Sequence, residues 1–127
     1  MSGEYADQPF ELGYGFETFF RQVAMFAFSV APLDCAPPVA DQPPTSTTAT
    51  FTFPSLEVGS YTQVNVLLWD PASGNQNFGS NEGNVTISTV TDTSVAGSVD
   101  YTRIDQYGQT YAVTGTFDAV RCTSIPR

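Results

Sequence analysis

The chain has 127 residues, of which 41% are hydrophobic and 13% charged, so its length and composition are those of one folded domain, residues 1–127. Thirteen acidic residues stand against four arginines, without lysine or histidine, and the formal net charge is −9. Nucleic acids and anionic membranes need clustered cations, so this balance argues against both as partners. Neutral glycans, calcium and cationic partners remain open, and acidity also serves solubility.

Hydrophobic side chains fall on even positions from Phe10 to Phe28, which predicts β-structure. Because a strand of that whole length would be unusual, we expect two strands divided near Arg21. The competing interpretation is a helix over residues 17–28, since a helical stripe is also formed by Phe16, Phe19, Phe20, Val23 and Ala27.

The middle of the chain alternates between short apolar segments and polar or proline-rich ones. Residues 32–48 contain five prolines and predict an extended surface loop. Residues 50–53, 61–69 and 84–90 predict strands. The intervening residues 70–83 are rich in Asn and Gly and predict a turn and a long loop.

The C-terminal part repeats itself, because the pattern of residues 95–101 recurs at 113–119 on either side of a turn. This predicts a hairpin, and pairing about Tyr107 sets Val99 opposite Gly115. Alternation predicts one apolar face, made of Val95, Val99, Tyr101, Tyr111, Val113 and Phe117. The polar face would carry Ser98, Asp100, Thr102, Thr114, Thr116 and Asp118. With about seven or eight strands in all, we expect an all-β fold, an antiparallel β-sandwich or barrel.

Two cysteines, Cys35 and Cys122, lie far apart in the sequence, and neither has metal-ligand spacing. We expect one disulfide bond between them, which implies a secreted, periplasmic or cell-surface protein. The alternative is two buried free thiols in a cytosolic protein. Residues 23–31, the longest apolar run, are too few to span a bilayer, so we expect no transmembrane segment and a leader that is absent from this chain.

The lack of histidine and lysine excludes a Ser-His-Asp triad and a Schiff base. A carboxylate pair of the glycosidase kind remains, Asp100 and Asp118. The hairpin register sets them opposite Thr114 and Ala96, as solvated strand residues. We therefore expect no enzymatic activity and name no catalytic residue.

Two kinds of binding site are suggested by residue type. Oxygen ligands for calcium, the one cofactor considered, are offered by Asp70, Asn75, Asn77 and Glu82. Ala72 and Gly74 break an EF-hand pattern there. Aromatic platforms for a neutral glycan are offered by Tyr61, Trp69, Phe78 and Tyr107. The alternatives are an ordinary loop for the first set and core packing for the second.

Three short motifs occur in the chain. The first is residues 3–10, which begin with Gly and end with Phe, and the second is V-G-S-Y at residues 58–61. The third is a repeated G-[ST]-[VF]-D, which starts at Gly97 and again at Gly115 and precedes Cys122. In these the chain resembles a loose group of uncharacterised secreted or lipid-anchored bacterial β-sandwich proteins. The first spacing is one residue longer than in that group. The resemblance implies an extracellular setting and carries over no activity.

These observations favour a non-catalytic extracellular binding or surface module, with a neutral glycan as the expected ligand. The alternative is a self-assembling structural subunit, in which the apolar segment 10–20 pairs with a sheet edge of a neighbouring copy. The two differ in where that segment packs.

Overall fold

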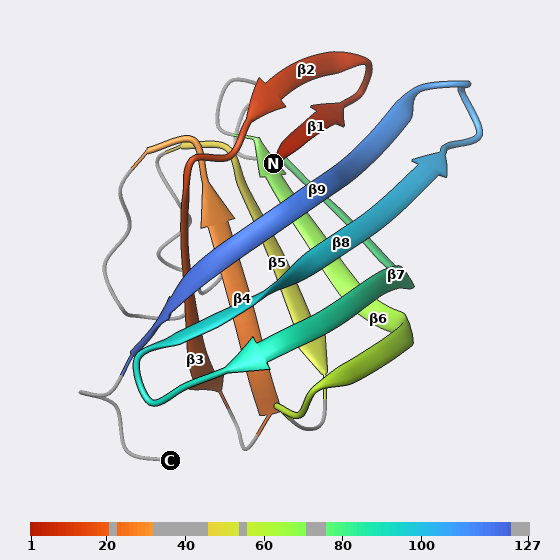
Figure 1. The fold of residues 1–127 in the computed structure, drawn as a ribbon. Coiled ribbons are helices and arrows are strands. Elements are labelled where there is room, and N and C mark those ends of the chain that lie inside the picture. The colour runs from red at the N-terminus through yellow and green to blue at the C-terminus, as the bar shows by residue number, and fades with distance from the viewer. Residues whose placement is uncertain (21–22, 32–45, 54–55, 71–75, 123–127) are drawn as a thin grey trace.

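The computed structural model describes residues 1–20, 23–31, 46–53, 56–70 and 76–122, with the main chain alone for residues 18–20, 23, 53 and 76–78. These residues form nine strands and no helix (Figure 1). The strands are β1 (Ser2–Tyr5), β2 (Gln8–Glu11), β3 (Tyr14–Phe20), β4 (Val23–Ser29), β5 (Thr48–Phe53), β6 (Gly59–Asp70), β7 (Gln76–Val90), β8 (Ser94–Ile104) and β9 (Thr110–Arg121).

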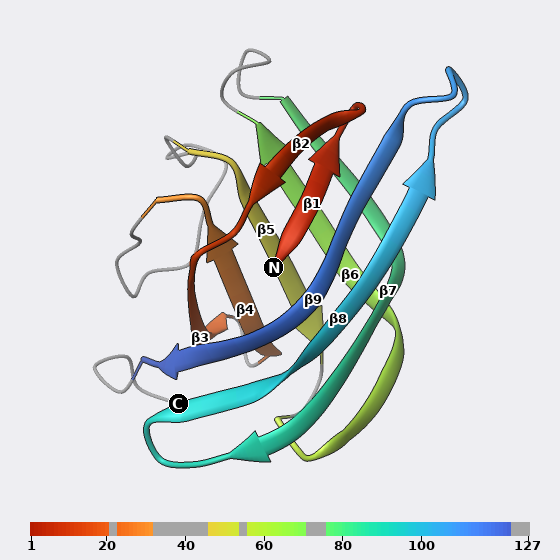
Figure 2. The ribbon, with the colours of Figure 1, turned by 45° about the horizontal axis from the view of Figure 1, so that its top comes forward.

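Seven of the strands close into a barrel in the order β3-β4-β5-β6-β7-β8-β9, and β9 returns to β3. Neighbouring strands are antiparallel except β3 and β9, which run parallel and pair only at Phe16 with Val120 and Glu17 with Arg121. β1 and β2 form an extra hairpin on β9, so β9 pairs with three strands. Figure 2 shows this hairpin beside one half of β9, while β3 meets the other end. Of the two expected architectures, the barrel is the one adopted.

The interior of the barrel is filled mainly by aromatic and branched side chains. The ring centroid of Phe117 lies 4.9 Å from that of Phe26 and 5.2 Å from that of Phe28. Tyr5 of β1 meets Tyr111 of β9 edge-on, with centroids 5.1 Å apart. The extra hairpin therefore packs onto the same core as the barrel strands.

The final hairpin, β8 and β9, follows the predicted register, with Val99 opposite Gly115. All six residues of the predicted apolar face are buried. On the predicted polar face Ser98 is half-buried and the other five residues are exposed. The sequence pattern is confirmed here because the pairing and the burial obey the same two-residue period.

The region expected to be either strand or helix is strand, in β3 and β4, so the helical alternative is wrong. The even positions do not mark one face, however. Phe16 opposes Ala27, and both pack with Cys122 in a small cluster apart from the main core. Glu17 instead opposes the core residue Phe26. The residues between β2 and β3 change the phase of the alternation.

The prediction of a loop over residues 70–83 is wrong for residues 76–83, which form the first half of β7 and pair with β6. Polar side chains support this pairing, since Asn65 Nδ2 donates a hydrogen bond to Asn81 Oδ1 at 2.8 Å. The register between β6 and β7 shifts twice, between Tyr61 and Val64 and between Val64 and Val66. Cross-strand contacts therefore override a composition that favours turns.

The β1–β2 hairpin has no clear sequence signal. Its turn residues Ala6 and Asp7 both have positive φ, 49° and 69°. Asn-Gly is the usual pair for such a turn, so the Ala-Asp pair found here does not predict one. The predicted proline-rich loop also ends sooner than expected, because Thr48 already belongs to β5 and is fully buried.

Only one of the two cysteines of the predicted disulfide bond lies within the described residues. Cys122 directly follows β9 and is 2% exposed, and its N–H donates to the Glu17 carbonyl oxygen at 2.8 Å. Cys35, like residues 32–45 of the proline-rich loop, lies outside the described residues. The bond therefore stays a prediction.

Candidate functional site

The four aromatic residues proposed for glycan binding do not form one platform. Tyr61 and Trp69 lie eight positions apart on β6, about 26 Å at the usual rise per residue. Trp69 is only 7% exposed, and the Tyr61 hydroxyl donates to the Glu57 carbonyl oxygen at 2.7 Å. Tyr107 is 79% exposed at the tip of the β8–β9 hairpin. The side chain of Phe78 lies outside the described residues, although its main chain pairs with Leu68.

The residues proposed for calcium are also dispersed. Asp70 is buried at the end of β6 and pairs in register with Gln76. Glu82 lies six positions further along β7, about 20 Å away, and forms an ion pair with Arg103. Asn77 is a β7 residue whose side chain is not described, and Asn75 is outside the described residues. Within the described part of the chain, no three potential metal ligands gather together.

The two carboxylates weighed for catalysis lie as the register predicted. Asp100 pairs with Thr114 and Asp118 with Ala96, and both aspartates are exposed. They are four positions apart along the ladder, about 13 Å. Glycosidase carboxylates lie roughly 5 to 9.5 Å apart, so these two are not arranged for that reaction.

The hydrogen-bonding pattern of β9 leaves an opening in the barrel wall. The Arg121 N–H donates to the Thr93 carbonyl oxygen, so odd-numbered residues of β9 bond to the β8 side. The main-chain groups of even-numbered residues point the other way, as shown by the bond from the Cys122 N–H to Glu17. β1 occupies that second side at residues 112–114 and β3 at residues 120–121.

Between β1 and β3, the main-chain groups of Thr116 and Asp118 therefore point into a gap. We call this gap the β9 groove. It is lined by Tyr14, Gly15, Phe28, Thr116, Phe117 and Asp118 and has a volume of about 280 Å³. At one end it is bounded by Met1, whose carbonyl oxygen accepts a hydrogen bond from the Leu12 N–H at 2.7 Å.

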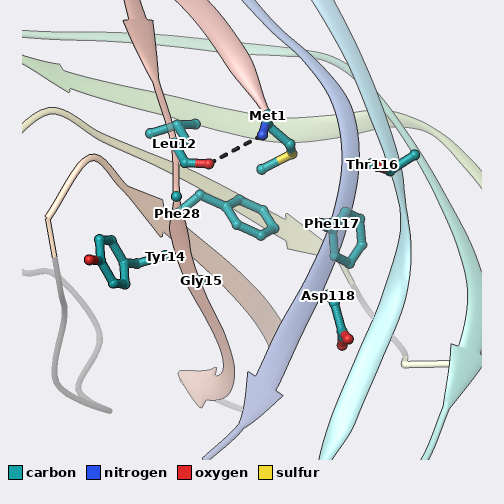
Figure 3. Close-up of a pocket in the computed structure, with 9 residues that line it drawn as sticks. Met1, Leu12, Tyr14, Gly15, Phe28, Thr116, Phe117 and Asp118 are labelled. Atoms are coloured by element: carbon teal, nitrogen blue, oxygen red, sulfur yellow. Dashed lines mark hydrogen bonds between the residues drawn. The ribbon is translucent and has the colours of Figure 1, made fainter.

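Figure 3 shows how the side chains of the β9 groove are distributed. The rings of Phe28 and Phe117, which belong to the core, form its apolar floor. Tyr14 lies on the β3 side and is 50% exposed, and Asp118 lies on the β9 side. The groove thus combines a carboxylate, a hydroxyl and a free stretch of sheet edge, and the Tyr14 ring points outward from β3 beside it.

Gly15 keeps the floor of the β9 groove open. A Cβ atom at this position would lie 2.5 Å from a ring carbon of Phe28. Real Cβ atoms do not approach other atoms that closely, so any larger residue would displace the Phe28 ring. The absence of a side chain on β3 lets Phe28 fill the space beneath the groove.

The two-residue period of the hairpin predicts that Thr116 and Asp118 lie on the surface, but it does not predict that they line a groove. The missing information was the position of β3 relative to β9. Their parallel pairing joins residues more than a hundred positions apart, Phe16 and Val120. No local pattern marks this edge, because it is created by the pairing of two strands that are distant in the sequence.

No family model, curated protein or solved structure matches this chain. In the described ranges there is also no helix long and apolar enough to cross a membrane.

Proposed function

We propose that this protein is a non-catalytic extracellular binding module and that the β9 groove holds a neutral glycan. The observation that carries the proposal is an opening whose β9 side bears Asp118 and Thr116 and whose β3 side includes the exposed Tyr14. A sugar ring presents C–H groups that pack on an aromatic face and hydroxyls that bond to carboxylate and hydroxyl oxygens. The main-chain groups of Thr116 and Asp118 add further donors and acceptors.

The charge of the chain supports a neutral ligand over an anionic one. With a formal net charge of −9, the protein repels polyanions at long range. Asp118 on the groove would also face an anionic sugar directly. A neutral glycan meets neither penalty, and it can use the carboxylate as a charge-assisted hydrogen-bond acceptor.

A self-assembling subunit is the less well supported alternative. It requires the apolar segment 10–20 to pair with a neighbouring copy. In the barrel, β3 pairs along its length with β4, and its residues Phe16 and Glu17 pair with the end of β9. That segment is therefore engaged within its own chain.

The expected extracellular location and the disulfide bond remain part of the proposal. Peptide mapping of the unreduced protein by mass spectrometry tests the bond directly. A linked peptide containing Cys35 and Cys122 would support an oxidising compartment. Two alkylated free cysteines in protein isolated from its native source would count against it.

The glycan is tested by titrating a panel of soluble neutral oligosaccharides, built from glucose, mannose, xylose or galactose, into the protein and following heat or amide shifts. We expect at least one to bind. Tyr14→Ala should weaken that binding about tenfold through lost ring contacts, and Asp118→Asn by a similar factor through loss of a charged acceptor.

Asp100→Asn is the matched control, because Asp100 lies on the same exposed face of the hairpin but outside the β9 groove. Its affinity should equal that of the unmodified protein. Absence of binding across the panel, or equal losses in the Asp100 and Asp118 variants, would contradict the proposed function.

A further inference from the structure

Strands β7 and β8 separate partway along their length. They pair from Asn84 with Asp100 to Val90 with Val95, and on the far side of Asn84 they diverge (Figures 1 and 2). The space between the diverging parts is a cleft of about 490 Å³, which we call the β7–β8 cleft. Its lining comes from both strands: Gly79, Ser80, Asn81, Glu82 and Arg103.

The direction of the main-chain groups on β8 alternates between its two neighbours. Directly after β8, the Asp105 N–H donates to the Gln109 carbonyl oxygen at 3.0 Å, so odd-numbered residues bond to the β9 side. At the start of β8, the Ser94 carbonyl oxygen accepts from the Thr91 N–H at 2.9 Å, so even-numbered residues bond to the β7 side.

The same alternation continues past Asp100, where the pairing with β7 ends. The next even-numbered residues are Thr102 and Ile104, which pair in register with β9 but with no described residue of β7. Their N–H and C=O groups therefore point into the β7–β8 cleft. On its other side, Gly79 and Ser80 of β7 pair with β6 and with no further described strand.

The chemistry of this edge specifies what can cover it. Donors and acceptors that recur every second residue, at about 7 Å, match the main chain of another extended segment. Proline, which blocks such pairing, is absent from residues 76–83 and 101–104. Ile104 is 62% exposed at this edge, so it offers apolar surface to a side chain of an added strand.

We propose that the β7–β8 cleft binds an extended cationic peptide, which adds a strand to the free edge of β8. Asp100 and Asp105 flank that edge and Glu82 lies across the cleft, whereas Arg103 is the single cation among the described residues beside it. The formal net charge of −9 also attracts a cationic peptide at long range.

The ion pair between Arg103 and Glu82 is a weak obstacle to this binding. Both side chains are about half exposed, and ion pairs of that kind add little to stability. A lysine of the peptide can therefore take over Glu82. The cleft and the β9 groove involve different strand edges, so this inference does not depend on the proposed function.

The test is an NMR titration of the protein with the peptide acetyl-Lys-Val-Lys-Val-Lys-Val-amide, up to about 2 mM, which covers millimolar dissociation constants. We expect the amide signals of Thr102 and Ile104 to shift with saturation and their hydrogen exchange to slow. The amides of Tyr101 and Arg103 should exchange slowly throughout, because they already bond to the β9 side.

Two altered peptides separate strand pairing from other kinds of contact with the unmodified protein. The same peptide N-methylated at every residue keeps its side chains and charges but loses its main-chain donors, so it should not bind. The peptide with Glu in place of each Lys should bind at least about tenfold more weakly, because the charges then repel. Equal binding of either altered peptide would overturn the proposal.

Thr102→Pro removes one donor from the cleft side of β8 without removing a bond to β9, and it should weaken binding at least about tenfold. Glu11→Pro is the matched control. The Leu12 N–H donates to Met1, so the Glu11 N–H points to the free edge of β2 instead. This variant should bind the peptide as the unmodified protein does. Equal losses in the two variants, or no saturable shift at Thr102 and Ile104, would contradict the inference.

Discussion

At the scale of single residues, close approach between strands decides which positions accept a side chain. Gly97 of β8 lies opposite Phe117, as the hairpin register predicted. A Cβ atom there would lie 2.0 Å from the main-chain oxygen of Thr86 and 3.1 Å from the Phe117 ring. Main-chain atoms in the middle of a sheet cannot move aside without breaking the ladder. The glycine is therefore required by packing.

Gly97→Ala should lower the free energy of unfolding by about 1 to 3 kcal/mol, because overpacking forces β7 and β8 apart. Urea denaturation followed by circular dichroism measures the change. Gly13→Ala is the control, since no atom lies within 4 Å of the added Cβ. It should stay within about 0.5 kcal/mol of the parent. Equal stabilities for the two variants would refute this packing argument.

The residue scale is also where the sequence was most informative. The two-residue period of the final hairpin predicted both its faces and its register, because the same alternation governs burial and pairing. The same reasoning misled at Glu17, a charged residue that lies fully inside the barrel. Burial of that carboxylate depends on Arg121 of a distant strand, which no local pattern reveals.

At the scale of strands, barrel closure depends on the short contact between β3 and β9. Glu17 Oε1 lies 3.3 Å from Arg121 Nε, and Arg121 Nη1 also donates to the Thr91 carbonyl oxygen at 2.8 Å. The guanidinium thus joins β3, β9 and the turn between β7 and β8. A buried ion pair at this position fixes which ends of the strands meet.

Arg121→Met should destabilise the fold by about 3 to 5 kcal/mol, because it removes the guanidinium from a fully buried carboxylate. Thermal and urea denaturation measure the loss. Arg103→Met serves as the control, since the Arg103 and Glu82 side chains are about half exposed and such a pair contributes about 0 to 1 kcal/mol. A loss for Arg121→Met no larger than that control would contradict a closing role for this ion pair.

The free edge of the extra hairpin, on β2, carries residues that discourage pairing with another molecule. β2 is the last strand of the sheet, and only β1 pairs with it among the described strands. Pro9 removes one main-chain donor from β2, and Glu11 is exposed and charged. Proline and charged residues discourage pairing between molecules. This edge is thus poorly suited to the assembly alternative.

At the scale of the whole molecule, one end of the barrel interior holds tyrosines that must stay neutral. Burial is the main cause that raises the pKa of Tyr5, Tyr101 and Tyr111 above 10.0. For Tyr111 the neighbouring Asp105 carboxylate adds to the rise, and it also accepts a hydrogen bond from the Tyr111 hydroxyl at 3.3 Å. The folded state therefore holds these protons more tightly than the unfolded chain.

The raised pKa values predict that the folded state loses stability at high pH. Below pH 10 the three tyrosines are neutral in both states, and the stability they support is fully present. Above pH 10 the unfolded chain releases their protons first, so the free energy of unfolding falls as pH rises. Urea denaturation between about pH 8 and pH 11 should show this decline. Tyr101→Phe should make the decline shallower; a slope identical to that of the unmodified protein would contradict the assignment.

The features that could be predicted from the sequence depend on neighbouring residues, whereas those that could not depend on contacts between residues distant in the sequence. The all-β class and the strands over residues 61–69 and 84–90 follow from local alternation. The closed barrel and the β9 groove depend on β3 meeting β9, which pairs Phe16 with Val120. The Asn and Gly content of residues 76–83 predicts a loop, because these residue types disfavour strands, yet pairing with β6 forms the first half of β7 there.

The edge of β9 is open between β1 and β3, and we propose that a glycan binds there. Amide hydrogen exchange by NMR tests it directly. In the free protein, the N–H groups of Thr116 and Asp118 should exchange much faster than those of Ala112 and Thr114, which β1 covers. Saturation with the tightest-binding oligosaccharide of the panel should slow the first pair and leave the second unchanged. Slow exchange at Thr116 and Asp118 in the free protein, or no change on saturation, would contradict the account.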